Sequence, residues 1–376
     1  MKKLDFTVPF SGFASTTFVN CFASVYMYLE KIAPPKGPAA LCNQWLHGQC
    51  NSCGNCAHKP QALQERYFFL FDTLCGRSAL RLRYDGVRTE VDCRINGSCG
   101  EAQALYDGGG AENIDFLFGL AGYDYHTVTA PCDMHRAVAG SIDAGRPVIV
   151  KLRGHGVPFC VLIGYGDDGY RMPDFRAAQA WPERPPREEE LEAAYIVDGR
   201  RAPRYGLLDG LKRIRRVMEE NEKAGLWDGY RQKMGTYGED SLGQDGPAGR
   251  QGRMARLAET MWYTFNCHNF AEVFRGYLDS GPFAHAFDGM GDMALLGQAS
   301  LEEALRTISW RYGYTHDLAW SLIGLSECIR WDDWKSHYYG DMLEVILRQI
   351  KENDEAVLRC VRDIIGALEG AAAKTE

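Results

Sequence analysis

The sequence contains no long hydrophobic run and no excess of positive charge. Its longest apolar stretches, at 157–165 and 318–325, fall short of the roughly 18 apolar residues that a membrane-spanning helix needs. The cations near Met1 are not followed by the apolar segment of a secretion signal, so we expect a cytoplasmic protein with no membrane partner. With 42 Lys and Arg residues against 50 Asp and Glu residues, the net charge of −8 disfavours a protein that coats nucleic acid.

The composition of the chain is typical of a globular protein. Its 376 residues are 45% hydrophobic and 24% charged, and this length is typical of two domains. The chain has 13 cysteines. Because their number is odd and no export signal is evident, we expect these thiols to serve a metal site or catalysis rather than a disulfide framework.

The pattern of apolar residues divides the chain into three parts. Residues 1–205 mix strand and helix signals and predict an α+β domain around an antiparallel sheet. Residues 206–252 predict a connecting helix and a linker rich in Gly and Asp, and residues 253–376 predict a helical domain. The predicted strands of the first part are 145–151, 158–165, 170–172 and 194–198, with a tight turn at 166–169, and its predicted helices are 21–32, 62–74, 112–121 and 133–143.

Cys21 is the strongest candidate for a catalytic residue. An apolar stripe from Phe22 onward predicts a helix that ends near Ala33, before a Pro-Pro pair, and Asn20 is a favoured N-cap residue. Cys21 would then be the first helical residue, where unpaired backbone amides and the helix dipole stabilise a thiolate. The alternative is that Cys21 is a small buried hydrophobic residue.

A thiolate nucleophile needs a base, and the base often needs an orienting group. His155 stands just before a predicted strand, and Asp174 follows the short strand after the turn, so a hairpin would bring the two together. In this hypothesis Cys21 attacks a carbonyl or thioester carbon, His155 takes the thiol proton, and Asp174 holds the imidazole tautomer. His126 and His135 are alternative bases.

Taken in order, these residues resemble a known family. A Cys that opens an early helix, a Gly-His before a V-L-I-G-Y strand, a D-D-G turn and then an Asp are similar to the papain-like cysteine peptidases that cleave double-glycine leader peptides. With its helical second half, the chain resembles the butirosin biosynthesis protein H family, whose namesake moves an aminoacyl group from a carrier-protein thioester to an amine.

The resemblance implies a papain-like first domain and a cysteine-dependent acyl or aminoacyl transferase of a specialised biosynthetic pathway, with no required cofactor. Its expected partners are a small-molecule or peptide acyl substrate and an acyl carrier protein, and the chain is also compatible with a homo-oligomer.

Two positions depart from the family pattern. Pro158 stands where the family has its His, so His155 would act from three residues upstream. The Gln that the family places before its Cys is missing, and Asn20, Thr16 or Thr17 would have to replace it in binding the oxyanion. Two alternatives therefore stay open: a cysteine peptidase or amidase with the same residues, and a non-catalytic binding protein that keeps the fold.

A cluster of cysteines at 42–58 is a separate candidate site. Two-residue gaps let adjacent thiolates bind one tetrahedral ion, so the segment predicts a structural zinc site, with a reduced cysteine-rich loop as the alternative. The expected ligands come from Cys42, Cys50, Cys53 and Cys56.

The helical part contains two polar clusters among aromatic residues. One consists of His268 and Asn269, and the other of His316 and Asp317, which we expect at the start of a helix capped by Thr315. Such residues are either hydrogen-bonded interior groups between helices or the lining of a substrate pocket.

Overall fold

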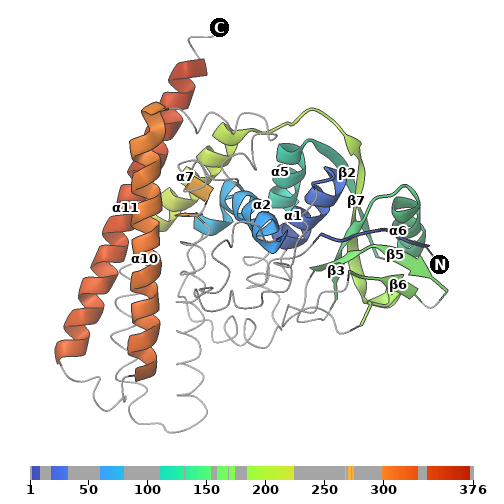
Figure 1. Cartoon of the computed structure of the whole chain (residues 1–376), viewed down its shortest axis with the longest axis horizontal. Coiled ribbons are helices and arrows are strands. Elements are labelled where there is room, and N and C mark those ends of the chain that lie inside the picture. Colours follow the sequence, from blue (N-terminus) through green and yellow to red (C-terminus); the bar gives the residue numbers. More distant parts are fainter. Residues whose placement is uncertain are drawn as a thin grey trace. The chain divides into compact units, whose positions relative to one another are not determined.

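The chain forms two compact units, and each unit draws on several segments. The computed structural model in Figure 1 describes residues 2–8, 18–32, 60–79, 111–130, 133–153, 159–167, 169–173, 184–223, 267, 270, 271, 273, 274, 299–328 and 337–372. Unit 1 consists of Met1–Phe71, Gln103–Gly206 and Gly281–Gly291, and unit 2 of Asp72–Ala102, Leu207–Ser280 and Asp292–Glu376. Each of the predicted domains, 1–205 and 253–376, is instead a single continuous segment of the chain.

Unit 1 combines antiparallel sheets with helices. Its strands are β1 (Lys2–Lys3), β2 (Tyr123–Thr129), β3 (Val148–Leu152), β4 (Phe159–Leu162), β5 (Gly164–Gly166), β6 (Gly169–Arg171) and β7 (Leu191–Arg200). They form a four-stranded sheet of order β2-β7-β3-β4 and a three-stranded sheet of order β1-β5-β6, with every pair antiparallel. Its helices are α1 (Phe18–Leu29), most of α2 (Pro60–Leu74), α5 (Ala111–Ala121) and α6 (Met134–Asp143), with a 3-10 turn, η5 (Glu188–Glu190).

The predicted turn at 166–169 is confirmed, but the strand before it is divided. β5 and β6 form a hairpin in which Gly166 faces Gly169, and Gly169 has the positive φ of 111° that its position in the turn requires. The segment predicted as one strand, 158–165, is two strands. β4 pairs with β3 in one sheet, whereas β5 pairs with β1 in the other. Because Ile163 separates the two strands, the chain passes from one sheet to the other at that residue.

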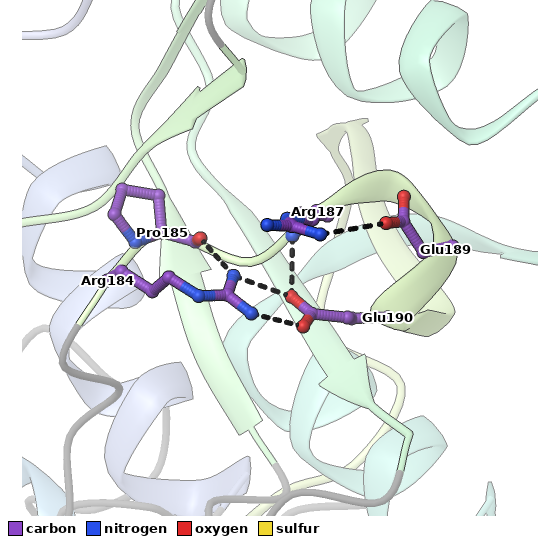
Figure 2. A network of polar contacts seen from close by, with 5 residues as sticks. All are labelled: Arg184, Pro185, Arg187, Glu189 and Glu190. Atoms are coloured by element: carbon purple, nitrogen blue, oxygen red, sulfur yellow. Dashed lines mark hydrogen bonds and ion pairs between the residues drawn. The ribbon is translucent and has the colours of Figure 1, made fainter.

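An ion-paired turn fixes the chain just before β7. Arg184 binds the carboxylate of Glu190 through both terminal nitrogens, at 2.5 and 3.0 Å, and the backbone amide of Arg187 donates to the same carboxylate at 2.7 Å (Figure 2). The neighbouring Glu188 accepts from the backbone amide of His135, in the first turn of α6, at 3.1 Å. This turn therefore links the start of β7 to α6.

Helix α1 ends earlier than the Pro-Pro pair alone would require. The backbone amides of Lys31 and Ile32 donate to the carbonyls of Tyr28 and Met27, at 3.1 and 2.9 Å, which is the Schellman arrangement for a helix C-terminus. Lys31 stands at the position that glycine usually occupies and has a φ of 55°. Glu30, just before it, accepts a hydrogen bond from the Tyr123 hydroxyl and pairs with Arg200, which anchors this end of α1 to β2 and β7.

Unit 2 is helical in the part that the structure describes. It contains η4 (Arg77–Ala79), α7 (Leu207–Lys223), η7 (Ala299–Leu301), α10 (Glu302–Cys328) and α11 (His337–Ala372). α10 and α11 pack along each other, and α11 is tied to α7 by ion pairs of Arg362 with Glu219 and of Lys212 with Glu369. Among the described helices of both units, none is long and apolar enough to cross a membrane.

We predict that Lys31→Gly stabilises the protein. A non-glycine residue with a left-handed backbone costs about 1–2 kcal/mol, and the extra freedom that glycine gives the unfolded chain returns about 0.4–1 kcal/mol of this. The net gain in unfolding free energy should therefore be about 0.5–1 kcal/mol, measured by urea denaturation. Lys31→Ala is the matched control, since it removes the same exposed side chain but keeps the Cβ atom, and a gain of similar size from alanine would contradict the explanation.

Candidate functional site

The structure places Cys21 in the first turn of α1 but not at its first residue. α1 begins at Phe18, so Cys21 is its fourth residue and the predicted N-cap role of Asn20 is wrong. The N-cap preference of asparagine is outweighed by packing, because the Phe18 ring contacts several aromatic rings and is 1% exposed. The dipole effect that favours a thiolate falls off within the first turn, so it acts on Cys21 in weakened form.

The side chain of Cys21 is completely buried. Both Cys21 and Asn20 have 0% exposure, and the neighbouring positions of α1 from Phe18 to Met27 are buried as well. This burial agrees with the alternative that Cys21 is a packed hydrophobic residue, and it does not by itself distinguish that role from catalysis.

The start of α1 lies against the start of β4. The rings of Phe18 and Phe159, the first residues of these two elements, have centroids 5.5 Å apart in an edge-to-face arrangement. Tyr195 of β7 contacts the same Phe18 ring at 5.2 Å, and α1 packs on both β3 and β4. His155 precedes Phe159 by four residues, a length of chain that spans at most about 14 Å. The fold thus brings the start of β4, the strand that follows His155 in the sequence, against the end of α1 that carries Cys21.

A buried amide that the sequence did not reveal binds two residues of α1 that flank Cys21. Gln64 of α2 has 0% exposure, and its Nε2 donates to Asn20 Oδ1 at 2.7 Å and to Ser24 Oγ at 3.1 Å. Nε2 also lies 3.4 Å from the backbone oxygen of Asn20. Asn20 and Ser24 are one helical turn apart, so a single side chain holds one face of α1 to α2. Nothing in the sequence marks Gln64 as a hydrogen-bond partner of Asn20 and Ser24.

Several of the predicted site residues lie outside the described part of the chain. They are Thr16, Thr17, His155, Asp174, His268, Asn269 and the four cysteines Cys42, Cys50, Cys53 and Cys56. The pairing of β5 with β6 ends at Arg171, three residues before Asp174. Among the described residues, no group of three or more His, Cys, Asp or Glu side chains is arranged to hold a metal ion. The structural zinc site therefore stays a prediction.

His316 and Asp317 do not begin a helix. They lie in the middle of α10, where Thr315 Oγ1 donates to the carbonyl of Arg311 at 2.8 Å instead of capping. A threonine followed by polar residues resembles an N-cap in sequence, but packing of the long helix overrides that signal. His316 Nδ1 lies 3.2 Å from the Asp317 carboxylate, and Trp320 donates to His316 Nε2 at 3.0 Å. These residues belong to unit 2 and Cys21 to unit 1.

The two alternative bases have partners of their own. His126 of β2 lies at the exposed face of the sheet, with Nδ1 2.8 Å from the Asp198 carboxylate. His135 is exposed on α6, and its ring contacts those of Tyr165 and Tyr170. The His126–Asp198 pair offers a useful reference imidazole for experiments on Cys21.

Comparison with family models, curated proteins and solved structures gives no match for this chain. The site is therefore interpreted from its own geometry.

We predict that Gln64→Leu destabilises the protein by about 1–3 kcal/mol. The substitution removes the two hydrogen bonds that Gln64 donates to Asn20 Oδ1 and Ser24 Oγ, and each buried hydrogen bond contributes about 0.5–1.5 kcal/mol to stability. Urea denaturation would measure the change in unfolding free energy.

A double-mutant cycle with Asn20→Ala serves as the control. The two side chains are hydrogen-bonded to each other. The loss of unfolding free energy in the double variant should therefore be smaller, by at least about 0.5 kcal/mol, than the summed losses of the two single variants. Strict additivity would show that the Gln64–Asn20 hydrogen bond does not contribute to stability.

Proposed function

We propose that unit 1 catalyses cysteine-dependent acyl transfer on a papain-like fold, with Cys21 as the nucleophile, as an acyl or aminoacyl transferase of a specialised biosynthetic pathway. The observation that supports this proposal most directly is the contact of Phe18 with Phe159. It joins the first turn of the cysteine-bearing helix to the beginning of β4, the strand that follows His155 in the chain.

The proposed reaction has two steps. Cys21 Sγ attacks the carbonyl carbon of a thioester or amide while His155 accepts the thiol proton, and the leaving thiol or amine departs with that proton. The resulting acyl-enzyme is a thioester. An amine then attacks its carbonyl carbon, gives a proton to His155 and releases Cys21, which completes the transfer. Asp174 orients His155 in both steps.

Attack by water instead of an amine would make the same site a cysteine peptidase or amidase. The first step is identical, so only the identity of the second nucleophile separates a transferase from a hydrolase. The resemblance to the butirosin biosynthesis protein H family favours the amine, and with it a carrier-protein thioester as the acyl donor.

The complete burial of Cys21 favours a second candidate, a binding protein that keeps the fold without catalysis. A nucleophile must be reached by its substrate, and a thiol with 0% exposure has to be uncovered before it can react. Cys160, in the neighbouring strand β4, is an internal example of a structural thiol, since burial raises its pKa. The two candidates therefore differ in the reactivity they assign to Cys21.

We predict that iodoacetamide at pH 7 alkylates Cys21 about tenfold faster than it alkylates free cysteine. An ordinary thiol is only a few per cent thiolate at this pH, so full ionisation strongly raises the rate of alkylation. The thiolate of an acidic thiol is a weaker nucleophile, but this lowers the rate by less than ionisation raises it. Peptide mass spectrometry would follow Cys21 and Cys160 in the same sample, and Cys160 should stay unlabelled.

Two histidine variants complete the test. His155→Ala should reduce the labelling of Cys21 at least to the rate of free cysteine, whereas His126→Ala, which removes an exposed imidazole with its own carboxylate partner, should leave it unchanged. Labelling of Cys21 as slow as that of Cys160 in the unmodified protein would instead establish the non-catalytic candidate.

A further inference from the structure

Helix α10 presents two large aromatic side chains to solvent. Trp310 is 62% exposed and Tyr314 is 39% exposed, and their rings stack with centroids 5.9 Å apart. The guanidinium of Arg311 lies 5.1 Å from the centre of the Trp310 ring. The opposite side of the same helix forms the core of unit 2 through Leu305, Ile308, Tyr312, Thr315 and Ala319. Exposed aromatic pairs of this kind are more frequent at interaction surfaces than on the rest of a protein surface.

The aromatic pair lies between Arg306, beside which Glu303 is also exposed, and Asp317. Arg306 precedes Trp310 by one turn, Asp317 follows Tyr314 by almost one turn, and their side chains are 67% and 77% exposed. Successive residues of an α-helix are rotated by about 100° around its axis. Arg306, Trp310, Tyr314 and Asp317 therefore fall within an arc of about 80° on one side of α10. We call this surface the α10 face.

Arg306 and Asp317 occupy complementary positions on the α10 face when the helix is reversed. The midpoint between Arg306 and Asp317 falls between residues 311 and 312, within one residue of Tyr312, the midpoint of Trp310 and Tyr314. A second α10 that crosses antiparallel at this point brings each Arg306 to the partner's Asp317 and the two aromatic pairs together. Such a contact is a two-fold, isologous interface, the commonest kind in homo-oligomers.

We propose that the α10 face is the interface of a homodimer, in which the occupant is a second copy of this chain. The face continues onto α11, because the Tyr314 hydroxyl donates to Gln349 at 3.2 Å and Val345 nearby is 41% exposed. Two helix pairs that pack through such faces form a four-helix contact with an apolar centre and a charged rim. Arg306 already binds Glu302 one turn earlier, so in the dimer it bridges two carboxylates. This inference does not rest on the proposed function.

Sedimentation equilibrium of the full chain between about 1 and 100 μM tests the proposal. The unmodified protein should dimerise, and Trp310→Ala should raise the dissociation constant at least about 30-fold, as expected for an aromatic residue at the centre of an interface. Trp320→Ala is the matched control. Trp320 is 45% exposed on the same helix but lies about 80° around it from Trp310, so its removal should leave the dissociation constant unchanged.

Charge reversal distinguishes a specific interface from general stickiness. Arg306→Glu and Asp317→Arg should each weaken the dimer because they place like charges together, and the double variant should restore it. Circular dichroism of each variant verifies that its helices are intact. A chain that is monomeric at 100 μM, a dimer indifferent to Trp310→Ala, or a double variant weaker than both single variants would each overturn the proposal. Binding of the α10 face to a different protein, in a sample in which this chain forms no dimer, would also overturn the proposal.

Discussion

The arrangement of unit 1 depends on one aromatic cluster at the start of α1. Phe18 contacts Phe22 one turn later, Phe118 of α5, Phe159 of β4 and Tyr195 of β7. Buried aromatic rings gain about 0.5–1.5 kcal/mol per well-oriented pair beyond their hydrophobic contribution, so this cluster is a strong determinant of where α1 begins. It fixes the first turn of the helix against the sheet, and every inference about Cys21 follows from that position.

The same cluster creates an electrostatic constraint on any chemistry at Cys21. The helix start contributes at most about 2 kcal/mol toward a thiolate, whereas removing a charge from water costs several kcal/mol. Desolvation therefore outweighs the dipole, and a buried thiolate at this position requires a cation beside it. In the proposed acyl transferase, the imidazolium of His155 would be that cation, so the catalytic and the non-catalytic candidate differ in whether His155 pairs with Cys21.

The sequence predicted those features that are set by local pattern. The turn at 166–169 and the helices 62–74, 112–121 and 133–143 were recognisable because turn residues and apolar periodicity act over short distances. Strand β2 was missed, since most of its seven residues are exposed at the edge of the sheet and the alternation of Tyr123 and Tyr125 with polar residues does not continue along the strand. Asn20 and Thr315 were misread as caps because packing, which sequence does not display, extends both helices past them. Gln64 could not be predicted for the same reason, because its role depends on the distance between α1 and α2 in space.

In unit 2, a buried polar network determines which side of α10 faces solvent. Asn353 of α11 donates to Thr315 Oγ1 at 2.9 Å and accepts from Arg311 at 3.0 Å, and the Tyr312 hydroxyl donates to Asp354 at 2.6 Å. A shift of α11 by one residue would break these bonds together and leave buried polar atoms without partners, at about 1–3 kcal/mol for each. Polar groups inside a helix pair thus specify register more than they add stability. Because the register holds Tyr312 and Thr315 inward, the rings of Trp310 and Tyr314 are turned outward, and their exposure is a consequence of the core rather than of a loosely packed helix.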